Sequence, residues 1–466
     1  MPSPGSIADT LQRDLAARLT ERGVPGAAVA VVADGRVMDA AAGVLSTATR
    51  VEATPEAVFQ IGSVTKVWTA TLVMQLVDEG LVELDAPVRT YLPELTLADD
   101  AAAAAVTVRQ LLNHTAGFEG DILTDTGRGD DAIAAYVGTL ADTAQVFPPG
   151  AFFSYNNAGY IVLGRLVERV RATTWQEALV KRIAAPLGLE RVSPSPYEAI
   201  LHRAAVGHVG PGDDGVETPA PMWALARSNE PAGSMLAMTA RDLAGFARMH
   251  LEPASATVLS ARSVRAMQQV EVRLPTLAGM GVAWGLGWEV YADGERRLLG
   301  HDGNTIGQAA FLRLVPEAGV AIVLLTNGGD GAGLFHDVAG PLLSELAGVE
   351  LPAGPTPPAE PVAVDPSPFL GTYSSTIVDF VVTQDDAGTV WLEQRPKGVL
   401  AELKPASRDE LVALDERSLI LREGAGGMHP VFVFLEPDAT GRPAYMHYGR
   451  AIARSHDDAL PAPARP

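Results

Sequence analysis

A serine and a lysine three positions apart have the residue types and the spacing that nucleophilic catalysis requires. The chain has four lysines, and only Lys66 follows a serine, Ser63, by three positions. On a helix such residues share a face, with Cβ atoms about 5–6 Å apart, so a hydroxyl and an amine can form a hydrogen bond. Gly62 and the strand-like stretch 58–61 place Ser63 at the N-terminal end of a predicted helix, where free N–H groups favour developing negative charge. The pair predicts an activated serine; the alternative is a helix-capping serine beside a solvated lysine.

Two later segments carry polar groups that could complete such a site. The pattern Tyr-x-Asn occurs once, from Tyr155 to Asn157, and His-Asp-Gly-Asn runs from His301 to Asn304 between two predicted strands. With Ser-x-x-Lys, these segments resemble the three-box signature of class C β-lactamases, DD-peptidases and related esterases. The resemblance covers roughly residues 23–346, and it extends to the segments 59–66, 107–117 and 231–234.

The resemblance implies catalytic roles for Ser63, Lys66 and Tyr155. Ser63 would attack a carbonyl carbon and form an acyl-enzyme. Lys66 and Tyr155 would share the acid and base work, and because their titrations must be coupled, the general base is left open between them. One of the two needs a pKa well below its ordinary value to act as a base near pH 7.

The resemblance also implies a substrate-binding set. Asn157 would form a hydrogen bond to the amide of the acyl group. The backbone N–H groups of Ser63 and of Asn304, which follows Gly303, would form the oxyanion hole. The third box would contribute His301, which the resemblance places with Ser63, Lys66 and Tyr155 among the catalytic side chains.

The chain departs from the family pattern at two positions. His301 stands where β-lactamases and DD-peptidases usually carry lysine, and a histidine with an ordinary pKa of about 6.5 is mostly neutral at pH 7. A fixed positive charge for a substrate carboxylate is therefore lost, which argues against β-lactam resistance and cell-wall synthesis. Esterases, D-amino-acid peptidases and acyltransferases of the family commonly show His-x-Gly. Asn156 replaces a frequent serine whose side chain usually faces away from the site. Asp302, next to His301, is expected to have a turn or loop role.

The strands that must position these residues are predicted at the beginning and at the end of one region of the chain, with helices between them. Two runs, 27–32 and 36–42, flank Asp34-Gly35, which is typical of a hairpin. A helix is predicted over 63–79, ended by Gly80. Strands are predicted at 285–292, 308–315 and 320–326, followed by a helix to about 348. This order predicts an α/β (α+β) fold with one antiparallel sheet flanked by helices and with a helical insert. The resemblance implies that this is the β-lactamase/transpeptidase-like fold.

A change in composition predicts a second domain. Residues 1–350 form the predicted catalytic domain, and the linker 351–368 contains seven prolines. Short alternating runs at 377–382, 390–394, 418–422, 431–435 and 445–448 predict a small antiparallel all-β domain over 369–455. The segment 368–373 resembles the start of the lipocalin-like barrels that follow this catalytic domain in some relatives. The tail, 456–466, is expected to be disordered.

Composition narrows the possible partners. The formal charge of −21 and the pI near 4.8 disfavour nucleic acid and an anionic membrane surface. The absence of cysteine removes disulfides and thiolate metal sites, and the nine histidines show no ligand spacing, so neither a metal nor a cofactor is expected. Neither a signal-peptide pattern nor a run of about 18–20 apolar residues is present, so a cytoplasmic location is expected.

These observations support one function class and leave its substrate open. The first hypothesis is a serine hydrolase or acyltransferase that acts on an ester or amide, with peptides containing a D-residue as candidate substrates. The alternatives are a penicillin-binding-protein-type thioesterase that releases or cyclises a carrier-bound peptide, a β-lactamase, and a non-catalytic binding protein. The corresponding candidate partners are a small-molecule or peptide acyl substrate, a second copy of the chain and, for a thioesterase, a carrier protein.

Overall fold

The computed structural model describes residues 4–210, 217–252, 257–360, 362–398, 401, 405–424 and 428–455. The tail that was expected to be disordered, 456–466, lies outside these residues.

An eight-stranded antiparallel sheet forms the centre of the N-terminal part, in the order β2-β1-β13-β12-β11-β10-β9-β8. The hairpin of β1 (Gly26–Ala33) and β2 (Arg36–Gly43) turns at Asp34 and Gly35, whose φ angles are 51° and 70°. The late strand β13 (Val320–Thr326) pairs with β1, so both ends of this region build one sheet, as predicted. The remaining strands are β8 (Val272–Arg273), β9 (Ala283–Trp284), β10 (Glu289–Ala292), β11 (Leu298–Asn304) and β12 (Ala309–Val315).

Strand β11 corrects one detail of the sequence prediction. His301 to Asn304 were placed between two strands, whereas they form the last residues of β11 and pair with Ala309 to Leu312 of β12. The alternation of a strand therefore decides which face each of these side chains occupies. Asp302 is accordingly a strand residue and not a turn residue.

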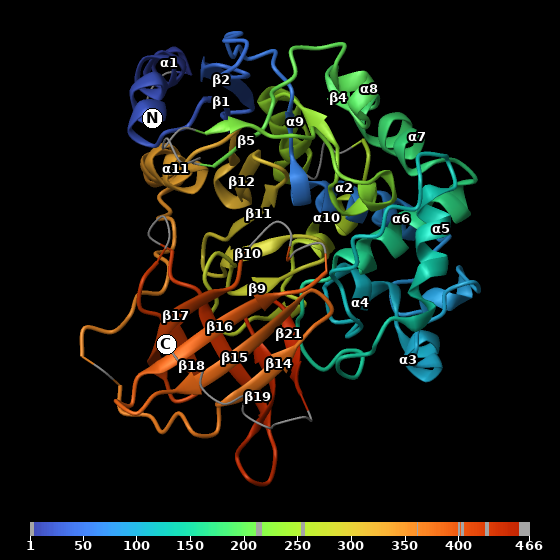
Figure 1. Ribbon diagram of the computed structural model, residues 1–466. Coiled ribbons are helices and arrows are strands. Elements are labelled where there is room, and N and C mark those ends of the chain that lie inside the picture. The colour runs from blue at the N-terminus through green and yellow to red at the C-terminus, as the bar shows by residue number, and fades with distance from the viewer. Residues whose placement is uncertain are drawn as a thin grey trace.

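Helices cover both faces of the sheet (Figure 1). On one face α1 (Pro4–Glu21) and α11 (Gly331–Ala347) pack on the side chains of β1 and β13. On the other face α2 (Thr65–Asp78) and α9 (Ala240–Leu251) lie between the sheet and a helical insert. The other helices are α3 (Asp100–Ala105), α4 (Val108–Leu112), α5 (Ala132–Gly138), α6 (Asn157–Arg171), α7 (Trp175–Leu179), α8 (Pro196–Ala199) and α10 (Ala261–Met267).

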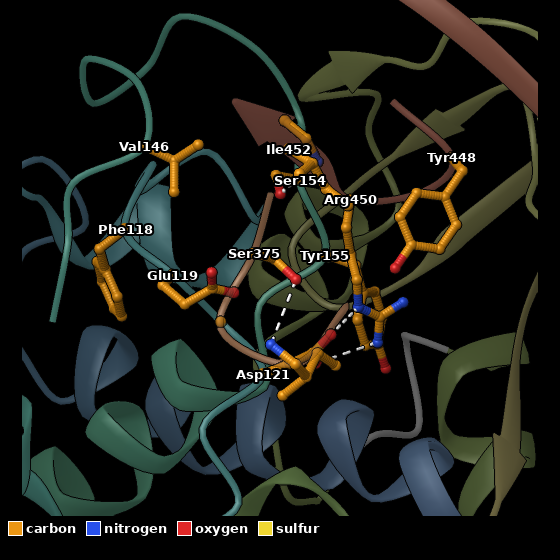
Figure 2. Close-up of a pocket in the computed structure, with 13 residues that line it drawn as sticks. Phe118, Glu119, Asp121, Val146, Ser154, Tyr155, Ser375, Tyr448, Arg450 and Ile452 are labelled. Carbon is orange, nitrogen blue, oxygen red and sulfur yellow. Dashed lines mark hydrogen bonds and ion pairs between the residues drawn. The ribbon is translucent and has the colours of Figure 1, made fainter. Parts of the chain in front are cut away.

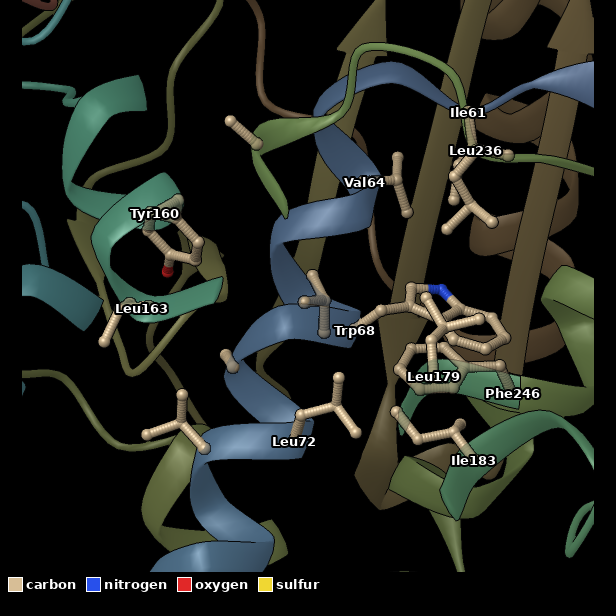
Figure 3. Packing of buried hydrophobic residues seen from close by; sticks show 14 of the residues in the cluster. Ile61, Val64, Trp68, Leu72, Tyr160, Leu163, Leu179, Ile183, Leu236 and Phe246 are labelled. Carbon is tan, nitrogen blue, oxygen red and sulfur yellow. The ribbon is translucent and has the colours of Figure 1, made fainter. Parts of the chain in front are cut away.

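Helix α2 runs through the core of this region and is buried from Thr65 to Leu76. Trp68 stacks on Phe246 of α9 with ring centroids 4.2 Å apart, and apolar side chains of the neighbouring helices surround the pair (Figure 3). A helix buried on all sides is held rigidly by its packing. Gly80 follows the helix with φ of 69°, as predicted for the residue that ends it.

The C-terminal part is a closed antiparallel barrel in the order β14 to β21, drawn in orange and red in Figure 1. Its strands are β14 (Gly371–Ser374), β15 (Val378–Gln384), β16 (Val390–Pro396), β17 (Ser407–Asp415), β18 (Ser418–Leu421), β19 (Val431–Pro437), β20 (Pro443–His447) and β21 (Ala451–Arg454). The five predicted runs correspond to β15, β16, β18, β19 and β20, and closure requires the three strands that the sequence pattern did not mark. Within the described ranges, we find no helix with the length and apolar character that crossing a membrane requires.

Candidate active site

Ser63 lies in a short 3₁₀ turn, η1 (Gly62–Val64), that leads directly into α2. The preceding strand β3 (Phe59–Gln60) pairs with β7 (Ala237–Met238), and the amide of Ile61 donates to the carbonyl oxygen of Leu236 at 3.0 Å. The predicted helix thus begins with a tighter turn, and Ser63 is held at the N-terminal end of a buried helix.

Three glycines let other backbone segments approach this turn. A Cβ atom on Gly303 would lie 2.0 Å from the carbonyl oxygen of Ile61 and 2.8 Å from the amide nitrogen of Ser63. A Cβ on Gly62 would lie 2.5 Å from the amide nitrogen of Asn304, and one on Gly233 would lie 2.2 Å from the carbonyl oxygen of Gly62. The end of β11, with Gly303 and Asn304, is therefore packed against Ser63 at a distance that only glycine permits.

Lys66 is fully buried and points at the serine. Its Nζ donates to Ser63 Oγ at 3.0 Å and to the carbonyl oxygen of Ala232 at 2.6 Å. Burial, followed by the nearby charge of Arg450, holds the pKa of Lys66 well below its ordinary value, and the carboxylates of Asp121 and Glu289 offset this only in part. The amine is thereby poised to accept a proton.

Tyr155 lies beside Lys66, whose Nζ is 4.8 Å from the centroid of the tyrosine ring. Burial raises the pKa of Tyr155, and a hydrogen bond with Ser63 lowers it in part. The ring stacks on His114, with centroids 4.5 Å apart, and His114 Nδ1 accepts the amide N–H of Asn156 at 3.0 Å. His114 thus helps to hold both the ring of Tyr155 and the backbone of Asn156 in place.

The side chain of Asn156 faces away from the site, as expected. Its Oδ1 accepts the amide N–H of Gly159 at 2.7 Å and caps α6, while its Nδ2 donates to the carbonyl oxygen of Phe118 at 2.8 Å. The residue therefore fixes the start of the helix that begins at Asn157.

His301 is buried beside Tyr155, with ring centroids 6.4 Å apart. Burial and the charge of Lys66 lower the pKa of His301 to about 3, so the ring is neutral near pH 7. Its Nδ1 lies 2.7 Å from the carbonyl oxygen of Asp302, which can only accept, so Nδ1 carries the proton and Nε2 is an acceptor. The third box therefore supplies no positive charge.

Behind His301, three ionisable side chains form a largely buried group. Asp302 accepts from Arg313 Nη1 at 2.5 Å and from Nη2 at 3.0 Å, which is the role that the sequence prediction missed. Glu289 Oε1 is 3.7 Å from His301 Nδ1. Burial and the neighbouring Asp302 raise the pKa of Glu289 to about 8.

A fixed positive charge does reach the site, and it comes from the barrel. Arg450, between β20 and β21, places its guanidinium carbon 5.1 Å from the centroid of the Tyr155 ring. Its Nε and Nη2 donate to the carboxylate of Asp121, the Nη2 contact measuring 3.2 Å (Figure 2). The same carboxylate accepts from Asn157 Nδ2 at 2.8 Å.

Backbone contacts attach the barrel to the second box. The amide of Tyr155 donates to the carbonyl oxygen of Gly449 at 2.9 Å, and the amide of Ala451 donates to Ser154 Oγ at 3.1 Å. His447 Nε2 donates to the carbonyl oxygen of Phe153 at 2.7 Å. The turn 447–451 is therefore part of the wall of the site.

The structure brings the residues predicted from the sequence together in one place: Ser63, Lys66, Tyr155, Asn157, His301, Gly303 and Asn304. Sequence reasoning missed Asp121 and Arg450. Asp121 follows the family-like segment 107–117 closely, which was a usable signal. Arg450 is one of 35 basic residues, and no local pattern marks it as reaching another domain.

The fold and the arrangement of the three boxes define a serine hydrolase. The β-lactamase family model matches residues 11–341. Penicillin-binding protein 4 of Amycolatopsis lactamdurans is 47% identical over 361 residues, which are 76% of this chain and 94% of that protein. The chain belongs to the β-lactamase family, together with relatives named as penicillin-binding proteins.

Two solved structures resemble the whole chain, barrel included. The crystal structure of SurE superposes with a TM-score of 0.80 at 30% identity and covers 97% of this chain and 100% of its own. An octameric penicillin-binding protein homologue from Pyrococcus abyssi has a TM-score of 0.63 at 22% identity and covers 97% and 99%, respectively, which shows a shared fold.

Proposed function

We propose that the protein transfers an acyl group from an ester or amide through a covalent intermediate on Ser63. The observation that carries the proposal is the 3.0 Å contact between Ser63 Oγ and the Nζ of a fully buried Lys66. A lysine whose pKa burial holds well below its ordinary value gives up its own proton more readily, and it can then take the serine proton, which an ordinary solvated lysine cannot do near pH 7.

The geometry supports the following first step. Ser63 Oγ attacks the carbonyl carbon while its proton passes to Lys66 Nζ. The developing oxyanion lies between the backbone N–H groups of Ser63 and Asn304, which the close packing of Gly62 and Gly303 places side by side. The leaving group then departs with a proton relayed through Tyr155, whose raised pKa keeps its hydroxyl protonated beforehand.

The second step returns the proton in the opposite direction. Lys66 or Tyr155 removes a proton from the acceptor, which is water or an amine, and the acceptor attacks the acyl carbon and releases Ser63. Coupling of the two groups makes them one proton-transfer unit, so each step uses both.

Peptides with a D-residue are the proposed acyl donors. A structure of SurE with D-Leu superposes on this chain with a TM-score of 0.76 at 30% identity, and it supports this substrate class. The neutral His301 argues against a β-lactam as the substrate, because the third box offers no lysine for its carboxylate. The octameric Pyrococcus abyssi structure supports proposing a homo-oligomer, which light scattering of the purified chain would test.

Intact-protein mass spectrometry tests the covalent step. The wild-type chain and Ser63→Ala are each incubated with a fluorophosphonate and with a p-nitrophenyl ester. We expect a mass increase in the wild type alone. Equal labelling of both proteins, or none of a folded wild type, would contradict the proposal. Paired D- and L-aminoacyl esters, with water or an amine as acceptor, would then define donor and acceptor.

A further inference from the structure

The carboxylate of Asp121 joins the second box to the barrel. Its Oδ1 accepts from Asn157 Nδ2 at 2.8 Å and from Arg450 Nη2 at 3.2 Å, and its Oδ2 accepts from Arg450 Nε. Asp121 is buried, with 9% of its surface exposed, whereas 30% of the Arg450 side chain is exposed, so these contacts are partly shielded from water. Figure 2 shows Asp121 and Arg450 facing each other beside Tyr155.

This contact fixes the orientation of the Asn157 amide. An ionised carboxylate only accepts hydrogen bonds, so the Nδ2 of Asn157 must face Asp121. The Oδ1 of Asn157 is then directed away from Asp121 as an acceptor. A side chain held in this way offers an acceptor to an N–H group of an acyl donor, and a freely rotating amide would lose this preference.

The barrel side of the contact is equally constrained. The Arg450 guanidinium forms a charge-assisted pair with Asp121, and the adjacent Gly449 accepts the Tyr155 amide N–H at 2.9 Å. Such pairs are stronger and more directional than neutral hydrogen bonds. One carboxylate therefore contacts both the barrel turn and the amide of Asn157.

The geometry points to Asp121 as a positioning residue that makes donor recognition by Asn157 depend on the docked barrel. The inference rests on the proposed acyl-transfer function and adds a substrate feature. Donors whose acyl group carries an amide N–H, as in a peptide, gain from Asp121, and simple esters without an amide do not.

Two esters with the same leaving group test this dependence: the p-nitrophenyl esters of an N-acetyl D-amino acid and of acetic acid. In Asp121→Asn, we expect kcat/KM for the amide-bearing ester to fall about tenfold to a hundredfold, as for loss of a hydrogen bond to a charged group. The reaction of the ester of acetic acid and the labelling by a fluorophosphonate should change only through the altered pKa of Lys66, which acts on both esters alike. The ratio of the two kcat/KM values is therefore the readout, because damage to the whole site would lower both.

Arg450→Gln removes the guanidinium group of the barrel that pairs with the same carboxylate. It should lower the same ratio, and the double variant should fall no further than the stronger single variant, because both remove one shared contact. Asp100→Asn is the matched control, since Asp100, the first residue of α3, accepts from Arg89 at 2.5 Å and has an exposed side chain. It should leave the ratio unchanged.

Two results would overturn the inference: an unchanged ratio in Asp121→Asn, or equal losses for both esters. A wild-type chain that reacts with neither ester nor the fluorophosphonate would overturn the proposed function itself, and the inference with it.

Discussion

The amide nitrogen of Tyr155 lies 2.9 Å from the carbonyl oxygen of Gly449, so a backbone hydrogen bond joins the segment of the proposed catalytic tyrosine to the barrel. The barrel turn has an unusual backbone conformation at this contact, because the φ angle of Gly449 is 102°, in the region that favours glycine. The catalytic geometry therefore depends on a residue nearly 300 positions further along the chain.

Gly449→Ala should lower both stability and turnover. A Cβ atom at this position would lie 3.1 Å from Met280 Sδ, and the strained backbone should cost about 1–3 kcal/mol of unfolding free energy. Gly441→Ala is the control, since Gly441 has φ of 82° with no atom within 4 Å of an added Cβ. Urea unfolding and kcat should both change for Gly449, and only unfolding should change for Gly441. Unaltered kcat in Gly449→Ala would contradict a catalytic role for the turn.

Gly303→Ala should slow acylation without a comparable loss of substrate affinity. An added Cβ would lie 2.0 Å from the Ile61 carbonyl oxygen and would push β11 away from Ser63. Loss of an oxyanion-hole donor typically costs about 10²–10³ in rate, and we expect a fall of that size in fluorophosphonate labelling. Gly294→Ala, where an added Cβ meets open space, should label normally. Normal labelling of Gly303→Ala would argue against this oxyanion hole.

Lys66→Met should abolish acylation while leaving the protein at least as stable near pH 7. Burial opposes the charged form of Lys66, and its pKa is lowered, so the folded state forgoes a proton that the unfolded chain binds. The free-energy cost to the folded state is present below the ordinary lysine pKa and disappears above it. The stability advantage of Lys66→Met over the wild type should therefore shrink as pH rises toward that value. Lys181→Met, at an exposed lysine paired with Glu177, is the control for labelling. Persistent acylation in Lys66→Met would exclude the lysine as the base.

The charges of Asp121 and Arg450 should shift the pH dependence of acylation in opposite directions. Arg450 lowers the pKa of Lys66 and Asp121 raises it. In Arg450→Gln the rise of labelling rate with pH should therefore move to higher pH, and in Asp121→Asn to lower pH. Fluorophosphonate labelling that is quenched at set times across a pH series measures the rate profiles of both variants. Shifts in the same direction would show that the variants act through a structural change instead.

Glu289→Gln should become more stabilising as pH rises. Burial and Asp302 raise the pKa of Glu289 to about 8, so the folded chain keeps a proton that the unfolded chain releases above its ordinary pKa. The contribution of Glu289 to stability is complete below the ordinary pKa and is lost as pH rises toward 8. Unfolding free energies of wild type and Glu289→Gln should therefore diverge between about pH 5 and 8. Glu317→Gln is the comparison, because the pKa of Glu317 is lowered beside Arg297, and its effect on the unfolding free energy should change in the opposite direction at acidic pH. A difference between wild type and Glu289→Gln that stays constant with pH would contradict the raised pKa of Glu289.

The sequence was sufficient for the catalytic framework because its signals are local. The hairpin at Asp34-Gly35 and the spacing of Ser63 and Lys66 each depend on neighbouring residues. The strand character of His301 was missed because Gly300, Asp302, Gly303 and Asn304 weaken the alternating pattern, and only pairing with β12 reveals the strand.

The remaining part of the site depends on contacts between distant segments. Three strands of the barrel, β14, β17 and β21, gave no clear alternation, and closure of the barrel holds them in place. Arg450 could not be assigned because its partner, Asp121, is more than 300 positions away. Burial, which lowers the pKa of both Lys66 and His301, is likewise a property of the packed structure.

The distance along the chain between Ser63 and Arg450 has a consequence for biosynthesis. Arg450 is added about 390 positions after Ser63. At a synthesis rate of about 5–20 residues per second, the nucleophile exists for roughly 20–80 s before the barrel turn is made. A nascent chain therefore carries its serine and lysine well before it has the residue that holds Asp121, which delays donor selection until the barrel has been synthesised.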